Sequence, residues 1–323
     1  MNQTVGPLLI DKDMMLSKQW RPVPRPMYGW AITIEKILKV IDLPSLDGSV
    51  INIFSDYSGQ HKGSKYETIT ALYFDLEASS AWEIKRCQIR DRWLPNGRRM
   101  SFKSLNDRHR QRDLIPFLEA ANDIVGLLVT LVISKSIHDL CVGDADFNKA
   151  KSSLALHQEW ALVNLEQTLR VAHLIGLLIG GLSRPGQNIY WISDEDQLFA
   201  NMKRTQDLST ILGKITGLYV QHQLGELGLC TTSIDPGDRF EEEAAAIADL
   251  TAGGISEVVN TIATQAGGKV PVRLAFPFER SFSHKTEAIS SWVWQSHGKL
   301  SKTVILFEKQ STGYSVSKWD MQV

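Results

Sequence analysis

The chain is poor in cysteine and almost neutral overall. Its three cysteines, Cys87, Cys141 and Cys230, lie far apart and form no Cys-x-x-Cys or Cys/His spacing, which argues against a disulfide framework and against a zinc site. Cysteines used in this way are typical of a reduced, cytoplasmic protein. The formal net charge of −1 over 323 residues argues against a protein that coats nucleic acid or an anionic membrane along its whole length, although it leaves room for a local basic groove.

Common catalytic motifs and long apolar runs are missing as well. Lys214 follows a glycine but lacks the earlier glycine of a phosphate-binding loop, and neither a GxSxG nucleophile elbow nor an HExxH zinc motif occurs. The apolar run Val171–Leu182 contains His173 and has 12 residues, whereas a membrane span needs about 20. The polar start of the chain predicts no signal peptide. We therefore expect no membrane segment, and a buried helix at Val171–Leu182.

The chain does contain carboxylates in apolar surroundings. Asp56 ends the strand-like run Ile51–Asp56, and Asp249 lies among small apolar residues in the helical pattern Ala244–Ile255. A carboxylate among Ala, Ile and Leu is costly unless a cation, a metal or a special environment stabilises it. Both positions are therefore candidates for a site.

A third acidic position follows the apolar run 189–193, where Asp194, Glu195 and Asp196 are consecutive. Acids at two strand ends and in one helix can converge on a divalent metal with oxygen ligands, so the sequence predicts Mg²⁺ or Mn²⁺ as the cofactor. Other interpretations stay open, because acids at strand ends also form turns and caps, and a buried helical Asp can pair with an arginine.

Hydrophobic periodicity predicts an α/β protein with a mixed sheet: three strands that include a hairpin, then alternating helices and strands, then a final helix. The expected strands are 51–56, 66–76, 82–89, 126–134, 189–193, 227–234, 304–307 and 314–319, and the expected helices are 30–43, 113–122, 154–182, 204–222 and 240–266. We expect an N-terminal extension over residues 1–49, a main domain over 50–267 and a small β-rich C-terminal appendage over 268–323.

Positive charge is concentrated between Lys85 and Arg112, where ten Lys and Arg residues face only two Asp residues. Trp93 and Phe102 lie in the same segment and could stack on bases. A groove that follows phosphates beside the acidic site would have this composition, and a solvated surface loop is the alternative. The residues expected to contact nucleic acid are Arg92, Arg98, Arg99, Lys103, Arg108, Arg110 and Arg112.

Several short segments resemble a bacterial family of uncharacterised proteins, the DUF3800 family, which is assigned to the ribonuclease H-like superfamily. The matching segments are Asp56-Tyr57-Ser58-Gly59, Ser101-Phe102-Lys103, Ser134-Lys135, Asp194-Glu195 and Ala246-Ile247-Ala248-Asp249-Leu250-Thr251-Ala252-Gly253. The chain departs from the family pattern at Tyr57, Ser134 and Ala246, where the family carries Glu, Asp and Gln. The resemblance covers residues 50–265 and implies a ribonuclease H-like sheet with flanking helices.

The resemblance also implies an activity, which we take as the expectation for this chain. A ribonuclease H-like protein of this kind would be a metal-dependent nuclease, with Asp56, Asp194 and Asp249 as metal ligands and Glu195 or Asp196 in support. Lys103 and Lys135 would meet a phosphate or the developing charge. A defence or mobile-element role, a protein partner in a multi-subunit system and a homo-oligomer are compatible with the resemblance. The alternative is a catalytically degenerate subunit that binds nucleic acid or a protein.

Overall fold

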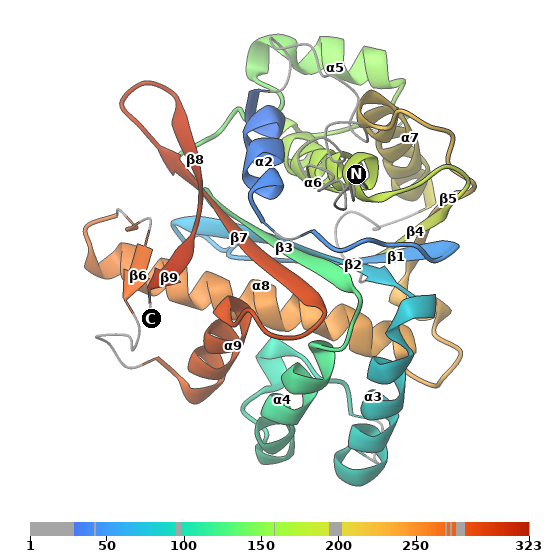
Figure 1. Ribbon diagram of the computed structural model, residues 1–323. Helices are drawn as coiled ribbons and strands as arrows, with labels where there is room; N and C mark the ends of the chain where they lie inside the picture. Colours follow the sequence, from blue (N-terminus) through green and yellow to red (C-terminus); the bar gives the residue numbers. More distant parts are fainter. Residues whose placement is uncertain are drawn as a thin grey trace, which may run out of the picture.

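A seven-stranded mixed sheet with helices on both faces forms the centre of the molecule (Figure 1). This computed structural model describes residues 29–41, 43–94, 98–157, 159–193, 202–268, 270–271, 273–275 and 282–322. The helices are α2 (Gly29–Lys39), α3 (Ser80–Trp93), α4 (Arg108–Ala121), α5 (Phe147–Leu154), α6 (Leu162–Leu182), α7 (Met202–Tyr219), α8 (Phe240–Gln265) and α9 (His284–Trp294), with short 3-10 turns η1 (Glu77–Ser79), η2 (Phe102–Ser104), η3 (Asp144–Asp146) and η5 (Thr232–Ile234). The strands are β1 (Val50–Ser58), β2 (Tyr66–Asp75), β3 (Gly126–Ser134), β4 (Asn188–Ser193), β5 (Leu227–Thr231), β6 (Arg273–Ala275), β7 (Leu300–Lys309), β8 (Tyr314–Lys318) and β9 (Asp320–Gln322).

The strands of the large sheet follow the order β5-β4-β1-β2-β3-β7-β8. β2 runs antiparallel to both β1 and β3, while β4 is parallel to β1 and β5 is parallel to β4. β1 therefore lies inside the sheet, with β2, β3, β7 and β8 on one side of it and the parallel strands β4 and β5 on the other. The predicted α/β class with a mixed sheet is confirmed.

Two hydrophobic cores fill the space on opposite faces of the sheet. Because side chains alternate along a strand, Ile51 and Ile53 of β1 point into the core under α2, α6 and α7, whereas Phe54 points into the core over α8. Figure 1 shows α2, α5, α6 and α7 on one face and α3, α4, α8 and α9 on the other. Asp56 is two residues beyond Phe54 and therefore faces α8.

The predicted strand at 82–89 is wrong, because these residues belong to helix α3. The residues that α3 buries, Trp82 and Arg86, are four apart and so share one helix face, and Glu83 forms an ion pair with Arg86 at the i,i+3 spacing. Ala, Glu, Lys, Arg and Gln in this segment favour a helix. The hairpin that leads the sheet is formed by β1 and β2 instead.

The described residues after 268 do not all form a separate β-rich appendage, because β7 and β8 belong to the large sheet, whereas β6 and β9 form a small two-stranded sheet. β7 runs parallel to β3 along residues 126–133, and β8 pairs with β7. All nine residues of β3 are buried, as expected for an interior strand of a sheet that is covered on both faces. α9 packs on α8 so closely that a Cβ added at Gly254 would lie 2.6 Å from Ile289.

The N-terminal region also contributes to the main fold. Trp30, Ile34 and Leu38 of α2 are fully buried in the core over α6. The part of the predicted extension that precedes residue 29 lies outside the described residues.

The predicted buried helix is confirmed as the second half of α6. By length and composition α6 could cross a membrane, but 78% of its most apolar window is buried inside the fold. It is therefore a core helix here.

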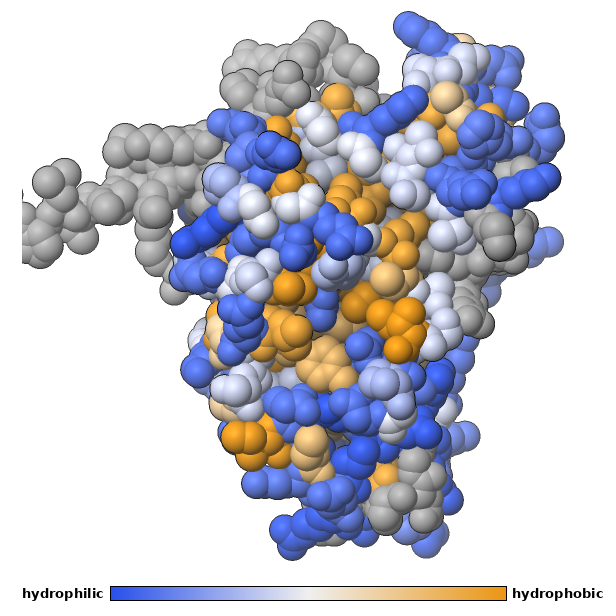
Figure 2. Space-filling view, turned by 90° about the vertical axis from the view of Figure 1, so that its right-hand side faces the viewer, coloured by the Kyte–Doolittle hydropathy of each residue, from blue (hydrophilic) through white to orange (hydrophobic). Residues whose placement is uncertain are grey.

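β5 is an edge strand of the large sheet, and its five residues are all half-buried. Figure 2 shows the side of the molecule on which this edge lies, with apolar residues gathered across the middle and polar residues above and below them.

His173 of α6 gives the stability a pH dependence. Its Nδ1 lies 2.7 Å from the Tyr219 hydroxyl, and burial lowers the pKa of His173 to about 3 from the usual 6.5. Since the unfolded chain binds the proton more readily, this residue should remove about 2 kcal/mol from the free energy of unfolding between pH 7 and pH 5. His173→Gln keeps a polar side chain but cannot titrate. In denaturant titrations, we expect its free energy of unfolding to fall between pH 7 and pH 5 by about 2 kcal/mol less than that of the native protein. Identical pH profiles for the two proteins would contradict this assignment.

Candidate active site

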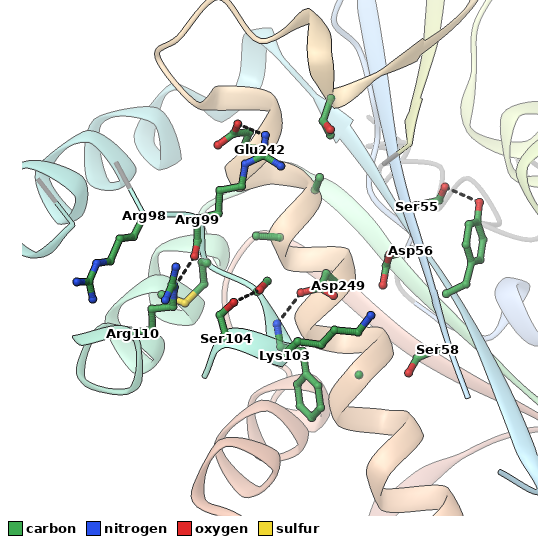
Figure 3. A pocket seen from close by; sticks show the side chains of 18 residues that line it. Ser55, Asp56, Ser58, Arg98, Arg99, Lys103, Ser104, Arg110, Glu242 and Asp249 are labelled. Carbon is green, nitrogen blue, oxygen red and sulfur yellow. Dashed lines mark hydrogen bonds and ion pairs between the residues drawn. The ribbon is translucent and has the colours of Figure 1, made fainter. Parts of the chain in front are cut away.

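A cavity of about 620 Å³ lies between the end of β1, the middle of α8 and the segment around η2 (Figure 3). Its lining combines carboxylates, basic side chains and hydroxyl groups: Ser55, Asp56, Tyr57, Ser58, Arg98, Arg99, Met100, Ser101, Phe102, Lys103, Ser104, Arg110, Thr232, Glu242, Ala245, Ala246, Asp249 and Gly253. The structure thus brings two of the predicted ligands, Asp56 and Asp249, into one cavity, although they are far apart in the sequence.

Asp56 reaches this cavity because of its place in the strand. It pairs with Thr70 of β2, and its neighbour Ser55 pairs with Ser193 of β4. The carboxylate is half-buried and faces α8, as the alternation along β1 requires. The Asp56 side chain is thus carried by an interior strand that is paired on both sides.

Asp249 occupies the face of α8 that is turned towards β1 (Figure 3). As the sequence predicted, Asp249 lies in a helix among apolar residues: it is half-buried itself, while its neighbours Ala248 and Leu250 are completely buried. Its Oδ2 accepts a hydrogen bond of 2.6 Å from the backbone N–H of Phe102. Partial exposure and this hydrogen bond reduce the cost of keeping the charge there.

Gly253 explains how the η2 segment comes so close to α8. A Cβ at this position would lie 2.3 Å from the ring of Phe102, so a side chain there would displace Phe102. Lys285 of α9 holds Phe102 from the other side, since its Nζ lies 3.9 Å from the ring centroid and donates to the backbone oxygen of Phe102 at 3.1 Å. Sequence reasoning missed this arrangement, although the glycine pair after Asp249 was its visible signal.

The basic segment contributes four side chains to the cavity wall, Arg98, Arg99, Lys103 and Arg110. Neighbouring carboxylates neutralise part of this positive charge. Arg99 pairs with Glu242, and Asp107 pairs with both Arg98 and Arg110. Lys103 is exposed and forms no ion pair within the described part of the chain. Figure 3 shows its side chain extending across α8 in the direction of β1.

The other predicted nucleic-acid contacts do not line this cavity. Arg92, Arg108 and Arg112 are exposed residues away from it, and Arg112 pairs with Asp113. Two further arginines of the same segment, Arg86 and Arg90, pair with the buried Glu243 at the start of α8. The charge of the segment is therefore divided between the cavity wall, the surface and a structural ion pair.

Lys135 has a different role from the one expected. Its Nζ donates to the backbone oxygens of Gly59, Gln60 and His61 at 3.3, 3.3 and 2.9 Å. Lys135 is absent from the cavity lining, and it fixes the loop that follows β1. Ser134, at the departure from the family pattern, hydrogen-bonds through Oγ to Ser136.

The third predicted acidic position, Asp194 with Glu195 and Asp196, lies outside the described residues. The described part of β4 ends at Ser193, which is the register partner of Ser55, the residue before Asp56.

A separate acidic group, Asp235, Asp238 and Glu241, lies close enough together to hold a cation. Backbone geometry accounts for it more simply. Asp235 accepts from the N–H groups of Gly237 and Arg239, and Asp238 accepts from the N–H of Phe240. Burial and the nearby Asp235 raise the pKa of Glu241. Asp235 and Asp238 thus stabilise the turn that leads into α8.

No protein-family model matches the chain, and no curated protein matches its sequence. The activity must therefore be inferred from the residues of the cavity.

Proposed function

We propose that the chain is a ribonuclease H-like, metal-dependent nuclease that hydrolyses phosphodiester bonds at the cavity between β1 and α8. The observation that carries the proposal is that Asp56 of the interior strand β1 and Asp249 of the long helix α8 line the same cavity, together with four basic side chains. In the ribonuclease H-like arrangement, the acid of the first strand lies at the centre of the sheet and the last helix brings another acid beside it. The hairpin-led sheet with the parallel strands β4 and β5 supports this proposal.

The donor set fits a hard divalent cation. Asp56 and Asp249 offer carboxylate oxygens, which Mg²⁺ and Mn²⁺ prefer, and both side chains are half-buried rather than sealed in the core. We assign Asp56, Asp249 and, as the residue that follows Ser193, Asp194 as the ligands, with Glu195 or Asp196 in support. The cation would supply activation of water and stabilisation of the leaving oxygen.

The chain's own basic residues would position the substrate. Lys103 is exposed at the cavity and has no ion-pair partner in the described part of the chain, so it can contact a phosphate without first breaking a salt bridge. Arg98 and Arg99 would add longer-range attraction, which Asp107 and Glu242 limit. Phe102 is already packed between Gly253 and Lys285, so it shapes the wall rather than stacking on a base.

Calorimetric titration with Mn²⁺ tests the metal site directly. We expect heat of binding with the native protein and an affinity at least about tenfold lower for Asp56→Ala, because a ligand is removed. Asp47→Ala is a matched control, since Asp47 is exposed and lies outside the cavity lining. An unchanged titration for Asp56→Ala would remove Asp56 from the proposed site.

A further inference from the structure

A second cavity of about 470 Å³ continues along α8 beyond Phe102. Its described lining residues are Ser58, His61, Ser64, Phe102, Gly253, Ser256, Glu257, Asn260, Thr261, Thr264 and Gln265. Three of them, Ser58, Phe102 and Gly253, also line the first cavity, so the two cavities share a wall. The second cavity therefore belongs to the same groove.

One face of α8 forms the floor of both cavities. Ala245, Asp249 and Gly253 are spaced by four residues in the first cavity, and Ser256, Asn260 and Thr264 continue at spacings of three and four in the second. At a rise of about 1.5 Å per residue, the span from residue 245 to residue 264 is about 28 Å. That length matches about eight phosphates of one strand at about 3.4 Å each.

The two cavities differ in their chemistry. The described lining of the second cavity contains hydroxyl and amide groups, one histidine and one carboxylate, Glu257, but neither lysine nor arginine. Hydroxyl and amide groups are the partners that position sugars and phosphates without neutralising charge. Ser64 and His61 hydrogen-bond to each other at 2.7 Å, and Ser283 donates to Glu257 at 3.3 Å. The walls are thus neutral over most of their surface.

Asn260 keeps this wall in place. Its Oδ1 accepts from the N–H groups of Lys65 and Tyr66 at 2.7 and 2.9 Å, and its Nδ2 donates to the backbone oxygens of Tyr66 and Ser256. The groove is therefore built on a rigid junction between α8 and β2.

From this continuity we infer that the second cavity binds the flank of the nucleic-acid strand whose scissile phosphate lies at Asp56 and Asp249. The inference rests on the proposed function and adds a direction to it, because the strand then runs along α8 from the basic wall to the hydroxyl-lined part. Affinity from this flank comes from hydrogen bonds and packing rather than from counterion release. A longer oligonucleotide should thus bind more tightly than a short one with almost the same dependence on salt.

Fluorescence anisotropy with labelled single-stranded DNA and RNA, in Ca²⁺, tests the inference with a charge-matched pair of variants. Thr264 lies in the groove and Thr210 lies on α7 outside both cavities, and each hydroxyl donates to the carbonyl oxygen four residues earlier. Thr264→Glu should weaken binding of a strand of about ten nucleotides about fivefold, as expected for one like charge placed close to a phosphate in water. A strand of about four nucleotides should bind Thr264→Glu normally, and Thr210→Glu should leave both strands unaffected.

Equal affinities of the two variants for the longer strand would overturn the groove assignment, and so would a native protein that binds neither strand. The proposed nuclease is judged separately, by whether cleavage in Mg²⁺ or Mn²⁺ is lost in Asp56→Asn. Length-dependent weakening in Thr264→Glu with cleavage independent of Asp56 would keep the groove and reject the catalytic site.

Discussion

Asp249→Asn should abolish cleavage of nucleic acid in Mg²⁺ or Mn²⁺, with a loss of about 100-fold or more. The amide oxygen of Asn can still accept the hydrogen bond from the Phe102 N–H, so the η2 segment should stay in place. What disappears is the negative charge that holds a divalent cation, and cation stabilisation of the reacting phosphate accounts for several kcal/mol of the barrier. A panel of labelled DNA and RNA substrates, single- and double-stranded, measures the loss and identifies the substrate in the same experiment.

The matched control is Asp47→Asn, which removes the same charge from an exposed carboxylate paired with Arg184. Full cleavage by this control together with loss in Asp249→Asn would establish the carboxylate site. Undiminished cleavage by Asp249→Asn would place the chemistry elsewhere. Absence of cleavage by the native protein on every substrate would favour the alternative of a degenerate subunit, which the departures from the family pattern at Tyr57, Ser134 and Ala246 suggest.

Elements with a continuous local pattern were predictable from the sequence. The apolar run of β3 has the bounds that were expected, residues 126–134, and α8 differs from its prediction by one residue. A buried strand, or a long helix with acidic residues in its first turn, carries its own signal within the segment. The same holds for Asp56 and Asp249, because their apolar neighbours in the sequence were enough to identify them as candidate site residues.

The predictions that failed concern features that depend on contacts between residues far apart in the sequence. The segment 82–89 was predicted to be a strand, yet it is a helix whose buried face, Trp82 and Arg86, packs against Phe240 of α8, far away in the sequence. The pairing of β7 with β3 joins residues more than 160 positions apart, so local pattern could identify β7 as a strand but not its partner. The positive charge of Lys135 fitted a role at the site, but its Nζ donates to the backbone oxygen of His61, a contact that only the folded structure shows.

The largest effect on stability should come from Glu243, at the start of the helix that carries Asp249. Glu243 is 2% exposed; it accepts from Arg86 Nη1 at 3.1 Å and from Arg90 Nε at 2.7 Å. Burial raises the pKa of Glu243, and the two guanidinium groups oppose that shift. Among the described residues, Glu243→Ala leaves the buried Arg86 with Glu83 and Asp238 as its acidic partners. Removing one member of a buried ion pair costs about 3–5 kcal/mol, so we expect the melting temperature to fall by about 10 °C.

Glu242→Ala is the matched control, because the preceding residue on the same helix pairs with the more exposed Arg99 and Arg239. Ion pairs near the surface contribute about 0–1 kcal/mol, so this variant should melt close to the native protein. Asp249 follows Glu243 by six residues, about 9 Å along the helix, so the ion pair also anchors the part of α8 that faces β1. Cleavage by Glu243→Ala should therefore be near native at low temperature and disappear earlier on heating. Equal melting temperatures for the two variants would show that α8 is held without Glu243.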